Sequence, residues 1–175
     1  MSEEEMPADA ATFIYLAKAD AFALAPACGM LLIATPAVWR ESVDECEPAE
    51  YADAATIRVA EEAGWIRRAG LTEAQARTAS QLGSMHRLGQ GESETLAIAQ
   101  PRSRVLVDDG RASRVAEALG LEPISTLFLP LLAVRARRLG GTEAKEQLRA
   151  LARVANARAE AVIELERLIE KEGAA

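Results

Sequence analysis

The sequence predicts an α/β fold in which a mainly parallel sheet is flanked by helices and followed by a long C-terminal helix. Short apolar runs of strand length alternate with segments of helical periodicity, the pattern of parallel strands covered by helices. Residues 142–171 contain neither Pro nor Gly and repeat apolar side chains at three- and four-residue spacings. We therefore expect one long amphipathic helix there, or two abutting ones.

In the first half of the chain, cap residues and apolar runs mark four helices and two strands. Thr35-Pro36 opens a helix, because Thr is a good N-cap and Pro fits the first helical turn. Thr72 opens another, and Gly64 closes the one before it. The expected elements are helices over 12–23, 36–43, 51–63 and 72–83, and strands over 30–34 and 65–66.

The second half of the chain continues this alternation. Pro101 stops one helix, because proline removes a backbone donor, and Gly120 ends another. Pro130 fits the first turn of an apolar helix, and Gly140-Gly141 breaks the chain after it. The expected elements are helices over 93–100, 111–119 and 127–139, and strands over 105–107 and 123–125.

Composition excludes some classes of protein. No apolar run approaches the length of a membrane span, and the chain starts with acids where a signal peptide would be basic. We therefore expect a cytoplasmic protein that makes no membrane contact. Cys28 and Cys46 lack the spacing of a metal motif and form no disulfide framework, so we expect both to be packing thiols.

The formal net charge of -7 argues against nucleic-acid binding by bulk electrostatics. The charge is uneven, however. Residues 1–50 carry ten acids against two basic residues, a balance of -8, whereas residues 102–138 carry seven arginines against four acids, a balance of +3. These arginines, beside an acidic pocket, could hold a phosphodiester; alternatively, they form solvated helix faces.

Acidic residues stand at several element boundaries. The strand over 105–107 ends directly in Asp108 and Asp109, and ligands of open α/β sheets bind beyond the carboxyl ends of the strands. Asp9 precedes a helix, Glu41 lies within one and Glu94 opens one. Dispersed carboxylates of this kind suit a magnesium ion that activates water for phosphodiester cleavage. The alternative is that acids at helix starts only stabilise the helix dipole.

Periodicity narrows some of these choices. Glu94 shares a helix face with apolar Ala97, whereas Glu92, two residues earlier, does not share its face, so Glu94 is expected in the pocket. Successive strand residues point to opposite faces, so either Asp108 or Asp109 is expected to point inward unless the strand has already ended. The sequence leaves that choice open.

Several segments together resemble PIN domains, in particular the branch near VapC-like toxins. They are DAATFIYLAKA from Asp9, TPAVWRES from Thr35, LGQGESETLAIA from Leu88 and VLVDDGRASRVAEALGL from Val105. The resemblance spans residues 9–140. It implies a parallel-sheet nuclease domain over residues 1–140 and a C-terminal helical extension over residues 141–175.

The resemblance also implies the chemistry of the site. Relatives resemble magnesium- or manganese-dependent ribonucleases with a pocket of three or four acids, so Mg²⁺ or Mn²⁺ is the expected cofactor. The implied catalytic residues are Asp9, Glu41, Glu94, Asp108 and Asp109, and the implied metal ligands are the same residues without Glu41. RNA is the expected substrate. An antitoxin protein that covers the active site, and a homodimer, are the expected partners.

One part of the chain departs from the family pattern. The residues before Asp9 do not form an apolar run, and those directly after it are Ala10 and Ala11 instead of Ser or Thr. We therefore expect the first strand to be missing, shortened or displaced. Ser125 and Thr126 could contact the pocket or a phosphate, or cap the next helix.

Two functions follow from these observations. The leading hypothesis is a divalent-metal-dependent endoribonuclease in which the acids hold the metal and a metal-activated water attacks the RNA phosphodiester. The alternative is a catalytically degenerate PIN-like domain that serves as an interaction or assembly module. Metal affinity distinguishes them, because a scaffold has no reason to keep a tight carboxylate site.

Overall fold

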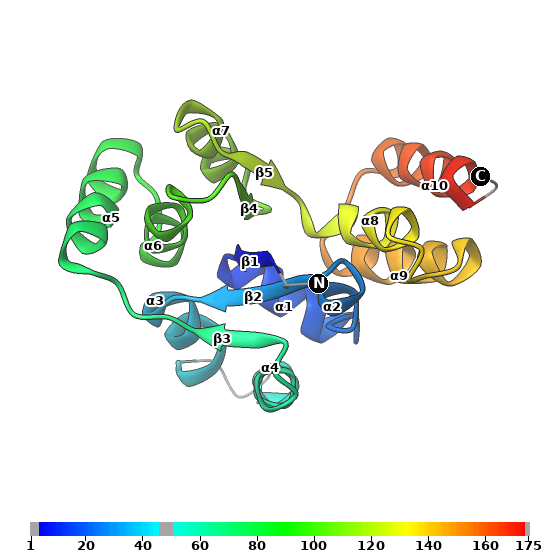
Figure 1. Cartoon of the computed structure of the whole chain (residues 1–175), viewed down its shortest axis with the longest axis horizontal. Coiled ribbons are helices and arrows are strands. Elements are labelled where there is room, and N and C mark those ends of the chain that lie inside the picture. The colour runs from blue at the N-terminus through cyan, green and yellow to red at the C-terminus, as the bar shows by residue number, and fades with distance from the viewer. Residues whose placement is uncertain (1–3, 46–50, 174–175) are drawn as a thin grey trace.

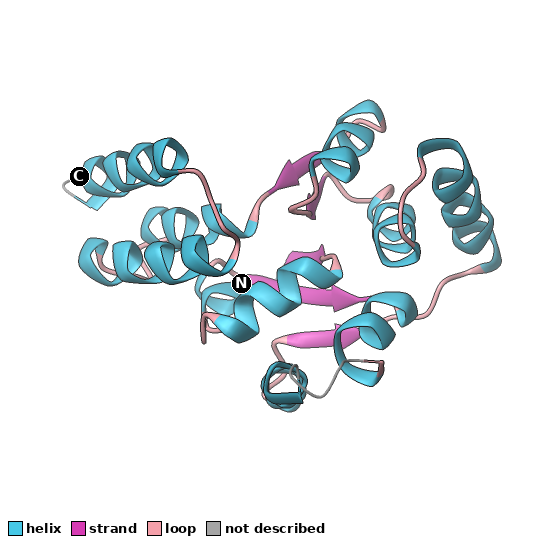
Figure 2. Cartoon of the chain, turned by 180° about the vertical axis from the view of Figure 1, so that it is seen from behind, coloured by secondary structure: helices cyan, strands magenta, loops and turns pink. Residues whose placement is uncertain are grey.

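Parallel strands form the centre of the molecule, with helices around them (Figures 1 and 2). The computed structural model describes residues 4–45 and 51–173, and in this part of the chain it contains five strands. They are β1 (Glu4–Pro7), β2 (Met30–Ala34), β3 (Ile66–Arg68), β4 (Arg104–Leu106) and β5 (Glu122–Ile124). All pairings are parallel, so the predicted α/β fold class is confirmed.

Among the described residues, one backbone bridge joins the two sets of paired strands. β1, β2 and β3 form one set of paired strands, and β4 pairs with β5. A parallel bridge between Ala8 and Leu106 connects them, and the Asp9 amide donates to the Leu106 carbonyl at 3.1 Å. The spatial order is therefore β3-β2-β1-β4-β5, and the carboxyl ends of β1 and β4 lie side by side.

The helices follow the predicted alternation closely. They are α1 (Ala10–Lys18), α2 (Leu24–Ala27), α3 (Pro36–Trp39), the π-helical turn η1 (Arg40–Asp44), α4 (Tyr51–Glu62), α5 (Glu73–His86), α6 (Gln90–Ala99), α7 (Gly110–Ala118), the 3₁₀ turn η3 (Thr126–Phe128), α8 (Leu129–Arg135), α9 (Gly141–Val154) and α10 (Ala159–Gly173). The helix expected over 12–23 ends at Lys18, because Asp20 has a left-handed backbone with φ of 50°, and α2 is a further short helix beyond the expected range. α5 and α6 lie at one end of the long axis, and α9 and α10 lie at the other (Figure 1).

The first strand is present, so the expectation that it is missing or displaced was wrong. β1 pairs with β2 along its whole length, from Glu4 opposite Met30 onward. Its polar start has an electrostatic explanation, because Arg104 pairs with Glu4, and Glu5 pairs with two arginines. The guanidinium of Arg102, followed by that of Arg67, lowers the pKa of Glu5.

These contacts also revise the reading of the arginine-rich segment. Arg102 and Arg104 neutralise the acids of β1, and Arg135 pairs with Glu172 of α10 at 2.9 Å. These three arginines therefore form intramolecular ion pairs in the described structure.

The position of β1 could not be found from apolar periodicity, because only its second half is buried.

The C-terminal residues of the described structure form a helical hairpin of α9 and α10. Of the two forms expected, the structure has two abutting helices, because Asn156 between them has a left-handed backbone with φ of 49°. Ion pairs between Lys145 and Glu170 and between Arg149 and Glu166 join the antiparallel helices. Exposed pairs of this kind contribute about 0–1 kcal/mol each, so packing must supply most of the stability.

The apolar side of the hairpin is buried against the rest of the chain. Leu148 of α9 and Ile169 of α10 are 0% exposed and pack with Leu131 and Val134 of α8. Leu151 reaches the main core, which also contains β1 and β2. The amphipathic stripe seen in the sequence is therefore covered within the protein.

Two smaller expectations concern thiols and membranes. The Cys28 thiol donates to the Leu129 carbonyl at 3.3 Å, and burial raises its pKa to about 12, as for a packing thiol. Cys46 lies outside the described residues. Within the described residues, none of the helices combines the length and apolarity needed to cross a bilayer.

Replacing Leu148 with Ala should lower the free energy of unfolding by about 2–5 kcal/mol, because it leaves a cavity between the hairpin and α8. Ile163→Ala is the matched control: Ile163 lies on α10 but is 51% exposed, so its loss should change stability by about 0.5 kcal/mol or less. Denaturant unfolding measures both. Equal losses for the two variants would contradict the described packing of the hairpin.

Candidate active site

Asp9 lies at the carboxyl end of β1 and caps α1. Its Oδ1 accepts hydrogen bonds from the amide and the hydroxyl of Thr12, each at 2.8 Å. Its Oδ2 accepts from the Asp108 amide at 3.3 Å. The side chain is only 2% exposed, so the fold places a carboxyl group in the interior next to the end of β4.

Asp108 follows β4 and faces Asp9. Its Oδ1 accepts hydrogen bonds from the Ser125 hydroxyl at 2.6 Å and from the Thr126 amide at 3.0 Å. Its Oδ2 accepts from the hydroxyls of Thr126 and Thr12. Two carboxyl groups and three hydroxyl groups thus meet at the carboxyl ends of neighbouring strands, and we call this group the Asp9–Asp108 pair.

The electrostatics of the Asp9–Asp108 pair are unfavourable for two negative charges. Burial, with a contribution from the negative charge of Asp108, raises the pKa of Asp9 to about 6, although hydrogen bonds from Thr12 and Asp108 oppose the rise. Burial and the charges of the same two carboxylates also raise the pKa of nearby Tyr15. Among the described residues, no cationic side chain forms an ion pair with either aspartate.

Asp109 occupies a different environment. It is exposed and caps α7, where its Oδ1 accepts from the amides of Arg111 at 2.7 Å and Ala112 at 2.9 Å. Of the two aspartates that the sequence left open, the structure brings Asp108 to Asp9 and turns Asp109 toward its own helix. Both residues lie after the end of β4, so strand alternation could not decide between them.

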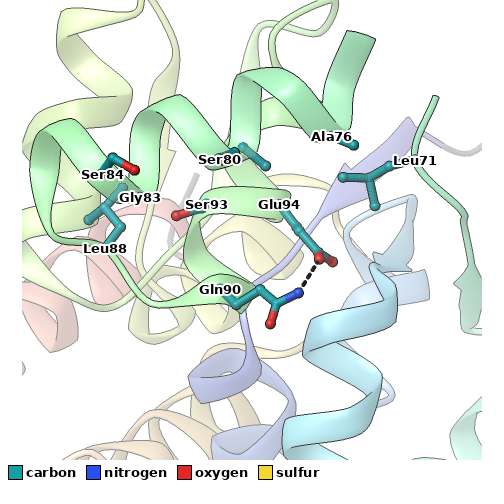
Figure 3. Close-up of a pocket in the computed structure, with 10 residues that line it drawn as sticks. Leu71, Ala76, Ser80, Gly83, Ser84, Leu88, Gln90, Ser93 and Glu94 are labelled. Carbon is teal, nitrogen blue, oxygen red and sulfur yellow. Dashed lines mark hydrogen bonds between the residues drawn. The ribbon is translucent and has the colours of Figure 1, made fainter. Parts of the chain in front are cut away.

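Glu94 lies on the buried side of α6, as the helical periodicity predicted. It is 8% exposed, and its two carboxylate oxygens accept from the Ala37 amide at 2.9 Å and from the Gln90 side chain at 3.0 Å (Figure 3). Glu92 instead bonds to the Gly89 amide at the start of α6. The bond to Ala37 ties α6 to the first turn of α3.

Glu41 lies in η1 and meets the start of α6. Its Oε1 accepts from the Gly91 amide at 3.0 Å, and burial raises its pKa, with smaller contributions from the charges of Glu92 and Glu94. Glycine permits this close approach, because a Cβ at position 91 would lie 2.6 Å from the Glu41 Oε2 and the Glu41 side chain would have to shift. Glu41 and Glu94 therefore form a second acidic group, between α3, η1 and α6.

A hydrogen bond connects the two acidic groups. The Thr95 hydroxyl donates to the Ala8 carbonyl at 3.3 Å, which places the residue after Glu94 against the residue before Asp9. Within residues 4–45 and 51–173, no group of three or more His, Cys, Asp or Glu side chains is arranged to hold a metal ion. The acids expected in one pocket are thus divided into two neighbouring groups and the separate Asp109.

The oxygen atoms at the Asp9–Asp108 pair are ligands of the kind that a hard divalent cation prefers. Magnesium prefers oxygen ligands, and it is usually bound through one or two carboxylates while it keeps several waters. The pair supplies two carboxylates surrounded by hydroxyls, and its buried negative charge has no described cationic partner. A cation there would compensate the negative charge of the two carboxylates, and so would oppose the effect of burial on Asp9.

A cavity adjoins the second acidic group. It has a volume of about 440 Å³ and lies between α5 and α6, with Glu94 and Gln90 in its wall (Figure 3). Hydroxyl groups of Ser80, Ser84 and Ser93 line it together with small and apolar side chains. It is therefore a concave, partly polar site beside one of the candidate acids.

Comparison with known proteins identifies the family. A family model described as a PIN domain matches residues 7–169, which include β2 to β5, the last residue of β1 and most of the C-terminal hairpin. The chain therefore belongs to the PIN domain family, whose members are generally nucleases and usually use divalent metals. No curated protein and no solved structure matches the chain significantly.

Sequence reasoning missed Thr12. Its hydroxyl contacts both Asp9 and Asp108, although Ala10 and Ala11 occupy the positions directly after Asp9. The signal was present, because a residue three positions after an N-cap has its amide beside the cap side chain. Ser125 combines both expected roles, since it donates to Asp108 and accepts from the Leu127 amide as a cap.

The Asp9 pKa has a consequence for stability. Because its folded value of about 6 lies above the unfolded value of about 3.9, protonated Asp9 stabilises the fold below pH 3.9 or so, and this contribution is lost as the pH rises through about 6. Asp108→Asn should lower the Asp9 pKa, because it removes a neighbouring charge. The value should stay above 3.9 or so, because burial, the larger cause, remains.

Carboxyl carbon NMR titration measures this pKa directly. Asp109→Asn is the matched control: it neutralises the adjacent residue, which does not contact Asp9, so the Asp9 titration should be unchanged. An identical Asp9 titration in wild type and Asp108→Asn would be incompatible with the coupling described above.

Proposed function

We propose that the protein is a divalent-metal-dependent endoribonuclease. The observation that carries the proposal is the Asp9–Asp108 pair, with one buried and one half-buried carboxylate, three hydroxyls and no described cationic partner at the carboxyl ends of β1 and β4. This is the edge of a parallel sheet at which ligands bind. Membership of a family of nucleases supports the same function.

In this proposal Asp9 and Asp108 hold Mg²⁺ or Mn²⁺. The bound ion would activate a water molecule and stabilise the charge that develops on the phosphodiester. Thr12, Ser125 and Thr126 hold the two carboxylates in place through hydrogen bonds. Their role is positioning, since each contacts a carboxylate.

Glu94 and Glu41 have a supporting role in the proposal. Glu94 is fixed by Ala37 and Gln90 beside the cavity, where its carboxylate would orient water on the substrate side. Glu41 is engaged by Gly91 and orients the start of α6, on which Glu94 stands. We assign Asp109 to helix capping, which makes it a suitable control.

The alternative function is a PIN-like assembly module without catalysis. The observation that favours it is that the carboxylate oxygens of Asp9, Asp108 and Glu94 all accept hydrogen bonds within the chain. Such groups can be purely structural. The two functions differ in metal affinity, which only the nuclease requires.

Asp108→Asn should abolish metal binding and reduce RNA cleavage by about 100-fold or more, because a metal-held charge contributes several kcal/mol to the transition state. Asp109→Asn should retain both properties. Calorimetric titration with Mn²⁺ and Mg²⁺ comes first, followed by cleavage of a mixed RNA pool with Glu94→Gln beside the other variants.

Metal binding by the wild type that Asp108→Asn removes supports the nuclease. Absence of metal binding by the wild type supports the assembly module. Equal binding and cleavage by wild type and Asp108→Asn would place the metal elsewhere and contradict the assigned site.

A finer proposal concerns the biological setting. We propose a toxin of the VapC type, with RNA as the substrate, an antitoxin protein as partner and a homodimer as the working form. Growth arrest on expression of the wild type, absent for Asp108→Asn, would support it. Light scattering tests the dimer, and normal growth with active enzyme would exclude the toxin role.

A further inference from the structure

The cavity between α5 and α6, which we call the α5–α6 cavity, is formed by one face of each helix. Ala76, Ser80 and Ser84 follow one another at four-residue spacing on α5, and Ser93 and Glu94 face them from α6 (Figure 3). The small side chains of α5 leave the space open. Its volume of about 440 Å³ is in the range of small-molecule sites, about 300–1,000 Å³.

The walls of the α5–α6 cavity combine hydrogen-bonding and apolar groups. The hydroxyls of Ser80 and Ser84 are exposed, and neither forms a hydrogen bond with another described residue. Ser93 donates to the Gly89 carbonyl at 2.8 Å, and its oxygen can still accept. Leu71 and Leu88 add apolar surface. The cavity therefore suits a flat or compact group with both apolar and polar edges.

Charge limits what the α5–α6 cavity can hold. Among the described residues that line it, Glu94 is the charged one and none is basic. A phosphate inside would meet a carboxylate without a compensating cation, which is unfavourable. A neutral group with donor hydroxyls or amines fits the acceptors of Glu94 and the serines.

A cation does stand beside the cavity. Arg40 donates from Nη2 to the Gln90 side chain at 2.8 Å, and Gln90 in turn donates to Glu94. An anionic group next to the cavity can therefore approach a guanidinium while its neutral neighbour occupies the interior. The cavity thus offers space for a neutral group, a guanidinium at its edge and a candidate catalytic acid in its wall. These features match the neutral nucleoside and the anionic phosphate of a nucleotide within a chain.

We propose that the α5–α6 cavity binds a nucleoside, the base and ribose next to the phosphodiester that the enzyme cleaves. The inference rests on the proposed ribonuclease function for the position of the phosphate, but the nucleoside site itself depends only on the cavity. Base edges and ribose hydroxyls would bond to Ser80, Ser84 and Glu94. The cavity would thereby select the nucleotide at which cleavage occurs.

The test fills the cavity from α5. Ser84→Leu places a larger apolar group in the space, and leucine favours helix more than serine does, so the helix should persist. Gln81→Leu is the matched control, because Gln81 is an exposed residue of α5 that does not line the cavity. Ser80→Leu provides a second cavity variant, and circular dichroism checks the fold of each.

Adenosine, cytidine, guanosine and uridine are each titrated into the full-length protein while backbone amide NMR signals are recorded. At least one nucleoside should shift the signals of residues 80, 84 and 93 in wild type and Gln81→Leu. Ser84→Leu should weaken this binding by about tenfold or more, which corresponds to about 1.4 kcal/mol, because the leucine side chain overfills the space that the nucleoside would occupy. For RNA cleavage, the KM should rise more than the kcat falls.

The outcomes separate the two proposals. Cleavage of RNA without nucleoside binding, or with equal binding by wild type and both cavity variants, overturns the nucleoside site and leaves the nuclease intact. Nucleoside binding that Ser84→Leu and Ser80→Leu weaken, in a protein that cleaves no RNA, supports the nucleoside site and overturns the nuclease.

Discussion

The bridge between Ala8 and Leu106 is the contact on which the remaining architecture depends. It joins two sets of parallel strands that share no other strand pairing in the part of the chain that the structure describes, and it sets β1 beside β4. Both strands end just beyond it, so Asp9 and Asp108 leave the sheet at the same place and face each other. The Thr95 hydroxyl donates to the carbonyl of Ala8, the bridge residue of the first set of strands, and so brings α6 to the bridge. One short stretch of backbone therefore determines where the acidic residues meet.

This arrangement concentrates negative charge in the interior. Asp9 is buried, its hydrogen bonds come from neutral groups, and its pKa is about 6. Near neutral pH the Asp9 carboxyl group is either protonated and neutral, or ionised as a buried charge beside Asp108. A bound divalent cation removes that conflict, because it compensates both carboxylates at once. At the proposed metal site, proton binding and metal binding at Asp9 would compete, so metal affinity would weaken as the pH falls through about 6.

Much of the fold follows from local signals, and the exceptions have physical causes. Caps such as Thr35 and Thr72 located helix starts, since their hydroxyls accept from amides in the structure. Helical periodicity also separated buried Glu94, which bonds to Ala37, from Glu92, which bonds to Gly89 at the start of α6. The strand β1 was not predicted, because its charged residues are paired with arginines about a hundred residues away, and no local sequence pattern reveals such partners. The partners of Asp108 likewise come from distant segments, so the choice over Asp109 needed the fold.

The position of α5 has an evolutionary consequence. It packs on α6 at the outer end of the molecule, with Gly83 close to Ser93, whereas β1 and β4, which precede the two aspartates, lie nearer the middle (Figure 1). Exposed residues of α5 such as Ser80 and Ser84 can therefore change without disturbing the central core. Relatives that share the aspartates could diverge in the shape of this outer helix alone. Selection could then alter which molecules such proteins recognise while it preserves the chemistry that they perform.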